Sequence, residues 1–221
     1  MRLRLPLLLG AIAAVAIVAS PAQAASSAGC SSTKPAAAGK PKPSFKKAGT
    51  VLAKGKRYAI VMTTTCGALR IVLDRKLGGP IPNSIAFLSS KHFFDGIGFH
   101  RVIGGYIIQG GDPRGDGTGT PGYEVVGALP QTYRYKVGDI AMAKTSIAPS
   151  GAAGSQFFVI SGKAGGQLSP DYGILGHATD AASLATIKRI DALATTSCGN
   201  PEGCPPSKNV WIVTTRLVTL P

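Results

Sequence analysis

Phe99-His100-Arg101-Val102-Ile103-Gly104-Gly105-Tyr106-Ile107-Ile108-Gln109-Gly110-Gly111-Asp112-Pro113 is the most informative stretch of this sequence. It sets an arginine, Arg101, and a glutamine, Gln109, among apolar and glycine residues. The runs Phe99–Ile103 and Tyr106–Gln109 are β-branched or aromatic and bounded by glycine, which predicts two short strands. An arginine within a strand is usually a solvated outward group, so neither polar residue identifies a function by itself.

Short strands are predicted over most of the chain from Tyr58 onwards. Tyr58–Thr65 and Ala68–Leu73 are separated by Cys66-Gly67, a tight-turn signal that predicts a β-hairpin. Further apolar or β-branched runs predict strands at Asp139–Ala143, Gln156–Ile160, Gly173–Gly176 and Val210–Val218.

Two segments have the period of a helix. Apolar residues at i, i+4 and i+7, with Pro82 in the first turn, predict a helix from Ile81 to about Lys91. Asp180 is a good cap for a second helix over Ala181–Leu193. This helix would turn Leu184, Ile187 and Ile190 towards the core. About eight strands and two helices indicate one mostly β domain, and the pattern alone does not choose between an antiparallel barrel and a sandwich.

The N-terminus has the pattern of an export signal. Met1–Arg4 is cationic, Leu5–Val18 is apolar, and Ala22-Gln23-Ala24 supplies a small-x-small cleavage site. The apolar run is short for a membrane span, which needs about 20 residues. We therefore interpret residues 1–24 as a signal peptide and expect the protein to be exported, either secreted or associated with the envelope.

Residues 25–57 carry eight basic side chains and no acidic one, whereas residues 58–221 carry fourteen basic and ten acidic side chains. The basic segment is rich in Pro, Ala and Lys and poor in large apolar groups, which predicts a disordered linker. Weak electrostatic contact of this linker with anionic surface polymer or lipid head groups is the expected consequence. A basic segment beside a nearly balanced domain does not favour nucleic acid as a partner.

Four cysteines fit two disulfides, since an exported protein meets an oxidising compartment. Cys198 and Cys204 enclose a turn-rich loop, which leaves Cys30 and Cys66 for each other. Four cysteines allow three pairings, so this pairing rests on proximity alone. Ser27-Ala28-Gly29-Cys30 also resembles the end of a lipoprotein signal, and lipidation of Cys30 is the alternative. No metal site is predicted, because the histidines show no ligand spacing to the cysteines.

Two other enzyme classes find little support. The glycine-rich run Gly110–Gly122 lacks the GK[ST] ending of a phosphate-binding loop, and no helix pattern follows it. No GxSxG elbow is present to suggest a serine hydrolase. We interpret Gly110–Gly122 as a long loop.

The chain from about Tyr58 to Thr219 resembles the cyclophilin family. The resemblance rests on Phe99–Ile103, Gln109–Pro113, Gly117-Thr118-Gly119, Met142-Ala143 and Gly154-Ser155-Gln156-Phe157-Phe158, in the family's order and at nearly its spacing. It implies a mostly β fold, an eight-stranded antiparallel β-barrel closed by two α-helices, over residues 58–221. It also implies a peptidyl-prolyl cis/trans isomerase that acts on proline-containing polypeptides, helps exported proteins to fold and needs no cofactor. We expect a monomer.

The same resemblance assigns roles to individual residues. Arg101 corresponds to the catalytic arginine and Gln109 to the polar residue that positions the site. The residues predicted to bind substrate are Tyr106, Ile107, Lys144, Gln156, Phe158, Leu168 and Tyr172. His100 is expected to support the arginine structurally.

Three departures from the family pattern bear on activity. Lys144-Thr145 replaces an Asn-Ala pair that holds the peptide backbone, Gln167 replaces a tryptophan, and Tyr172 replaces a histidine. They leave open a non-catalytic alternative, a module or chaperone that binds proline segments at the cell envelope.

Overall fold

The computed structural model describes residues 29–127, 129–196, 198–200 and 203–221. The predicted signal peptide, residues 1–24, lies outside the described residues. No helix in the described ranges is long and apolar enough to cross a membrane.

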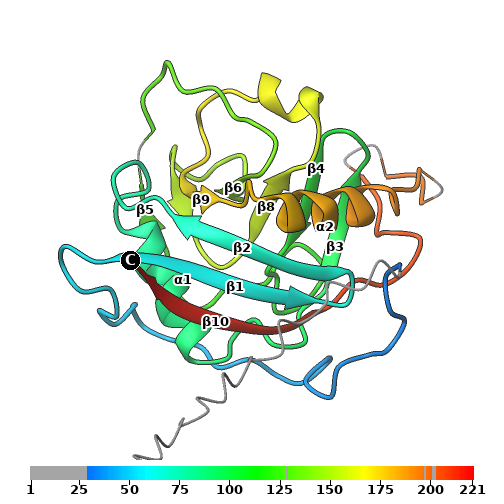
Figure 1. The fold of residues 1–221 in the computed structure, drawn as a ribbon, viewed down its shortest axis with the longest axis horizontal. Helices are drawn as coiled ribbons and strands as arrows, with labels where there is room; N and C mark the ends of the chain where they lie inside the picture. Colours follow the sequence, from blue (N-terminus) through cyan, green and yellow to red (C-terminus); the bar gives the residue numbers. More distant parts are fainter. Residues whose placement is uncertain (1–28, 128, 197, 201–202) are drawn as a thin grey trace, which may run out of the picture.

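The fold is a curled antiparallel sheet with two α-helices (Figure 1), as the resemblance implied. Its strands, in spatial order, are β10 (Ile212–Leu220), β1 (Arg57–Thr64), β2 (Gly67–Leu73), β9 (Ile174–His177), β6 (Asp139–Met142), β8 (Phe157–Ile160), β4 (Ile107–Gly110) and β3 (Phe99–Ile103). The edge strands approach each other at one end, where Gly98 bridges Trp211 and the Phe99 amide donates to the Val210 carbonyl over 2.9 Å. The sequence analysis missed the short strands β5 (Val125–Val126) and β7 (Ala152–Ala153), which pair with each other.

The hairpin of β1 and β2 forms at the predicted turn. Gly67 adopts φ +125°, a conformation that residues with a Cβ rarely reach. β2 alternates buried with exposed or partly exposed side chains, and β1 alternates buried with partly exposed side chains from Ile60 onwards, because one face of the hairpin covers the core.

The helices begin where their sequence signals predicted. Helix α1 (Ile81–Ser90) packs against β10 and β9, and α2 (Ala181–Asp191) packs against β2. The Asp180 carboxylate caps α2 by accepting from the Ser183 amide over 3.0 Å. Leu184 differs from the prediction, because Ser183 takes the inward position and leaves Leu184 36% exposed. The 3₁₀-helix η1 (Lys163–Gln167) was not predicted.

Apolar side chains form two clusters. The larger one fills the interior of the curled sheet, with Phe93, Phe94 and Phe157 among its largest fully buried side chains. The smaller one is built around Ile107, Phe158 and Tyr135. The second cluster provides the apolar side of the candidate site.

Residues 29–56, here called the arm, run along the outside of the domain (Figure 1). This differs from the disordered linker expected over 25–57. Leu52 is 5% exposed within the main core cluster, and the ring of Phe45 packs edge-on against that of Phe87, with centroids 5.1 Å apart. Asn83 of α1 holds the backbone here, since its side-chain oxygen accepts from the Val51 amide over 3.0 Å.

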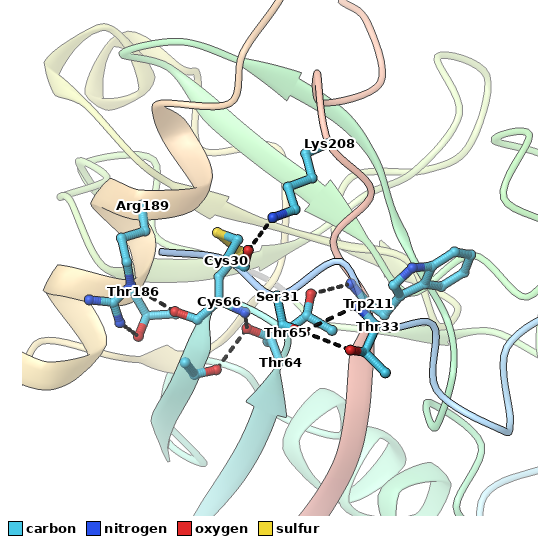
Figure 2. Close-up of a disulfide and its surroundings, with 11 residues drawn as sticks. Cys30, Ser31, Thr33, Thr64, Thr65, Cys66, Thr186, Arg189, Lys208 and Trp211 are labelled. Atoms are coloured by element: carbon cyan, nitrogen blue, oxygen red, sulfur yellow. Dashed lines mark hydrogen bonds between the residues drawn. A yellow bond between two sulfur atoms is a disulfide. The ribbon is translucent and has the colours of Figure 1, made fainter. Parts of the chain in front are cut away.

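A disulfide between Cys30 and Cys66 fixes the start of the arm to the hairpin turn (Figure 2). Beside it, the Ser31 amide donates to the Thr65 carbonyl over 2.7 Å, and the Lys208 ammonium donates to the Cys30 carbonyl. Composition suggested too little apolar area to order this segment. A covalent tether together with a few docked apolar side chains accounts for the difference, because the tether lowers the entropy lost on ordering.

The second disulfide joins Cys198 to Cys204, so both predicted pairings are confirmed. The structure thus describes Cys30 in its disulfide form. Lipidation of Cys30 would need the same sulfur, so the two forms exclude each other.

Candidate functional site

All nine residues predicted to act in catalysis or substrate binding line one cleft of about 1000 Å³. They come from β3, β4 and β8 and from segments adjoining β4, β6, β8, β9 and η1: Arg101, Tyr106, Ile107, Gln109, Lys144, Gln156, Phe158, Leu168 and Tyr172. Sheet curvature and strand order bring them together from a span of 72 positions in the sequence.

A chain of hydrogen bonds holds the guanidinium of Arg101. Nη1 of Arg101 donates to Oε1 of Gln109 over 2.9 Å, and Nε2 of Gln109 donates to Oε1 of Gln156 over 3.2 Å. Nε2 of Gln156 in turn donates to the carbonyls of Gly117 and Gly119 over 2.9 and 3.0 Å. The glycine-rich loop thus fixes Gln156, which fixes Gln109, and Gln109 in turn orients the guanidinium of Arg101.

An irregularity in strand pairing helps to aim Arg101. Arg101 pairs with Gln109 and Phe99 pairs with Gly110, so His100 is an extra residue on β3. Such a bulge interrupts strict alternation and re-aims the flanking side chains. Both His100 and Arg101 consequently line the cleft.

The apolar side of the cleft is formed by well-packed side chains. Ile107 and Phe158 are almost fully buried, and Leu168 and Tyr172 pack against their cluster. The Tyr172 ring meets that of Phe158 edge-on, with centroids 5.2 Å apart. These residues make a rigid concave surface suited to a small apolar ring.

Lys144 lines the cleft, but its ammonium is engaged within the protein. Nζ of Lys144 lies 2.7 Å from Oδ2 of Asp171 and 3.2 Å from the carbonyl oxygen of Ala148. It also lies 5.6 Å from the centroid of the Tyr172 ring. These contacts indicate that the Lys144 side chain joins the segment after β6 to the segment before β9.

Two titratable groups of the cleft are kept neutral by their surroundings. Burial lowers the pKa of His100, which favours the uncharged imidazole. Burial, with a smaller effect from Tyr172, raises the pKa of Tyr106, which favours its protonated hydroxyl. Neither group is prepared to act as a strong base near neutral pH.

The sequence analysis missed one wall of the cleft. Cys198, Asn200, Gly203 and Pro205 line it, beside Arg101. A Cβ on Gly203 would lie 3.1 Å from Nε of Arg101, and the Val102 amide donates to the Cys204 carbonyl over 2.8 Å. The cysteine spacing predicted this small ring but gave no signal of where it would pack. Asp171 was also missed, because a single aspartate in a loop carries no local signal.

Within the described ranges, no group of three or more His, Cys, Asp or Glu side chains is arranged to hold a metal ion. The cleft offers instead an oriented guanidinium, amide groups and an apolar concavity. This equipment can bind a polypeptide segment and donate hydrogen bonds to it.

A curled antiparallel sheet with two helices and such a cleft defines a β-barrel protein of the cyclophilin-like class. The family model described as "Cyclophilin type peptidyl-prolyl cis-trans isomerase/CLD" matches residues 59–217. The chain belongs to this family.

Curated relatives agree with this assignment. "Peptidyl-prolyl cis-trans isomerase A" of Mycobacterium tuberculosis (strain ATCC 25618 / H37Rv) is 41% identical over 113 residues, which cover 51% of this chain and 60% of that protein. "Probable peptidyl-prolyl cis-trans isomerase B" of Mycobacterium leprae (strain TN) is 30% identical over 184 residues, which cover 77% of this chain and 60% of that protein. The matches thus span about three fifths of the length of these relatives.

A solved structure shares the fold. The cyclophilin type peptidyl-prolyl cis-trans isomerase of Cryptosporidium parvum, crystallised in the presence of the dipeptide Ala-Pro, superposes with a TM-score of 0.60 at 26% identity. The match covers 72% of this chain and 98% of that one.

Proposed function

We propose that this protein is a peptidyl-prolyl cis/trans isomerase that accelerates rotation about X-Pro bonds in exported polypeptides. The observation that carries the proposal is the Arg101 guanidinium, fixed by Gln109 beside the apolar surface of Ile107 and Phe158. Family membership and the Ala-Pro dipeptide present with the Cryptosporidium parvum relative support the same substrate class.

The reaction suits this equipment. Rotation about the peptide bond faces a barrier of about 18–20 kcal/mol, yet no covalent bond is made or broken. In the twisted imide the proline nitrogen becomes pyramidal and exposes a lone pair. Arg101 can donate a hydrogen bond to that lone pair in the twisted state and hardly at all in the planar state, which is the differential binding that lowers a barrier.

The apolar surface has a complementary role. Ile107, Phe158, Leu168 and Tyr172 would hold the proline ring while the preceding carbonyl rotates. Because the ring is held on one side of the bond, the energy of binding keeps the amide in the orientation in which it reacts. The low polarity of this surface also strengthens the electrostatic effect of the arginine.

Export of the protein is part of the proposal. The signal sequence predicted over residues 1–24 supports it, and so do the two disulfides, since such bonds persist in oxidising compartments. In such a compartment slow proline isomerisation can limit the folding of newly exported chains. Whether the protein is released or retained at the envelope depends on the state of Cys30.

A second candidate is a non-catalytic module that only holds proline segments. The engagement of Lys144 by Asp171 favours this module, because an ammonium that is occupied within the protein does not hold the substrate backbone while the bond rotates. The two candidates separate in an isomerase assay of the full chain on a proline tetrapeptide, combined with a binding titration of the same peptide. Rate acceleration that Arg101→Ala abolishes supports the enzyme. Binding without acceleration supports the module and overturns our proposal.

A further inference from the structure

A second, smaller pocket of about 290 Å³ lies between the arm and the domain. The arm contributes residues between Lys34 and Lys42, and the domain contributes the segments around Gly96–His100, Asp112–Gly115 and Asn209–Trp211. The arm approaches closely here, since a Cβ on Gly96 would lie 2.3 Å from the carbonyl carbon of Ala37. The pocket exists only because the arm is docked.

Four cationic side chains line this pocket: Lys34, Lys40, Lys42 and Arg114. Among the described residues, none of the four forms an ion pair with a carboxylate. Lys42 donates to the backbone carbonyl of Asp95, and the Lys34 ammonium lies 5.8 Å from the centroid of the Trp211 ring.

The one carboxylate in the lining, Asp112, is already engaged. It is 1% exposed, and its oxygens accept from the Arg114 and Gly117 amides over 2.8 and 2.5 Å. Asp112 keeps its negative charge, and Asp95 and Asp116 attract Lys42 and Arg114 electrostatically, but the lining still carries four cationic side chains against one carboxylate. Lys34, Lys40 and Arg114 are exposed and Lys42 is half-buried, so an anion in the pocket gains a modest attraction that salt screens.

The pocket adjoins the catalytic cleft. His100, Gly115 and Pro205 line both cavities, so they form a shared wall. Nδ1 of His100 is buried and has no hydrogen-bond partner among the described residues. A chain seated in the cleft could pass over this wall and place a further side chain in the pocket.

We infer that this pocket binds an acidic side chain of the same polypeptide whose proline occupies the cleft. It would act as a substrate-selecting subsite built by the arm. The position of the proline in this inference rests on the proposed function. The binding of a carboxylate in the pocket does not depend on that function. The protein would then prefer proline segments with a nearby Asp or Glu.

The tryptophan in the pocket provides a direct test, because Trp211 is the single tryptophan of the chain. Proline peptides carrying one Glu, scanned through the positions on either side of the proline, are titrated into the full chain at low salt. Matched peptides carry Gln instead. We expect at least one Glu peptide to change Trp211 emission and to bind about twofold to fivefold more tightly than its Gln partner. This preference should shrink as salt screens it.

Variants of the arm locate the effect. Lys34→Glu/Lys40→Glu should abolish the preference for the Glu peptide. Lys46→Glu/Lys47→Glu is the matched control, since it makes the same charge change on exposed arm residues that line neither cavity, and it should keep the preference. Isomerase activity on a neutral peptide should be equal in the unchanged protein, the Lys34→Glu/Lys40→Glu variant and the control variant.

The inference is overturned if every Glu and Gln pair binds equally, or if the control pair loses the preference as fully as the pocket pair. It is also overturned if acetate alone alters Trp211 emission while the peptides show no preference. These readouts stay separate from catalysis. Absence of isomerase activity on all peptides would defeat the proposed function, whereas the peptide titration would still decide the pocket.

Discussion

Arg101 and Gln109 face each other across β3 and β4, and Nη1 of the arginine donates to Oε1 of the glutamine over 2.9 Å. Cross-strand partners on neighbouring strands keep a fixed separation, because the backbone ladder sets it. The guanidinium is therefore positioned by the sheet itself. Its proposed role follows from this rigidity, since a fixed donor can distinguish the twisted imide from the planar one.

Arg101→Ala should lower kcat/KM by about 10- to 100-fold, a loss of roughly 1.4 to 2.7 kcal/mol in transition-state stabilisation. Arg101→Lys should also be poor, because an ammonium lacks the planar fork that holds one donor on Gln109 while another reaches the imide. Peptide affinity measured by titration should change much less. Full activity in a correctly folded Arg101→Ala protein would exclude the catalytic role.

In the proposed mechanism Gln109 acts through Arg101, so it should behave as a positioning residue. Gln109→Leu should lower kcat roughly tenfold and leave KM nearly unchanged, because the arginine loses its orientation and not its charge. Gln109→Glu keeps an oxygen that can accept from Arg101 and should recover part of the rate. Equal loss in both variants would indicate that the side chain serves only packing.

Asp171 holds Lys144 through an ion pair with an Nζ–Oδ2 distance of 2.7 Å, in which the lysine side chain is only 6% exposed. Asp171→Asn should loosen the loop after Lys144 and the Tyr172 wall, and so raise KM about twofold to fivefold with little change in kcat. Asp116→Asn is the control, since this exposed carboxylate also lines the cleft but accepts from the Thr118 amide and hydroxyl instead of pairing with Lys144. An unchanged KM in Asp171→Asn would show that the pair does not shape the site.

His177 bridges two carboxylates, with Nδ1 2.8 Å from Oδ1 of Asp139 and Nε2 3.2 Å from Oδ2 of Asp74. The hydrogen bond with Asp139 raises the pKa of His177 and outweighs the opposing effect of burial, with Asp74 adding to the rise. The protonated form is thus favoured in the folded protein. Its contribution to stability is fully present below the unfolded pKa of about 6.5 and is lost as pH rises through the raised folded pKa.

The test compares the free energy of unfolding of the unchanged protein and His177→Gln by urea titration between about pH 6 and 9. The difference should be largest at the acidic end and decline towards the alkaline end. His92→Gln is the control, because the His92 side chain is 72% exposed and its pair with Asp95 should contribute little. A difference that grows with pH would contradict the assignment.

The Cys30–Cys66 disulfide should hold the arm in place. Cys30→Ser/Cys66→Ser should lower the free energy of unfolding by about 2–4 kcal/mol. It should also make the arm lysines cleavable by trypsin before the domain is cut. The Cys198–Cys204 disulfide closes a shorter ring that does not include the arm, so Cys198→Ser/Cys204→Ser should leave the arm protected. Equal protection of the arm in both double variants would show that non-covalent contacts suffice.

The sequence by itself determined the local elements and indicated the candidate site residues. Turn signals, strand periodicity and the Asp180 cap are properties of neighbouring residues, and the structure places those elements within one or two residues of the predicted bounds. The combination of Phe99–Ile103 with Gln109–Pro113 indicated the family and nine candidate site residues. All nine line one cleft because the strand order β9-β6-β8-β4-β3 places their segments side by side.

Only the tertiary structure decided how distant segments meet. The docked arm, the disulfide ring beside Arg101 and the pair between Lys144 and Asp171 all join segments that carry no signal for each other in sequence. The composition of residues 25–57, considered as an isolated chain, indicated too little apolar area for this segment to fold. A segment tethered by a disulfide to a preformed surface loses less entropy on ordering, so a few contacts such as Leu52 in the core and Asn83 on the backbone suffice to dock it.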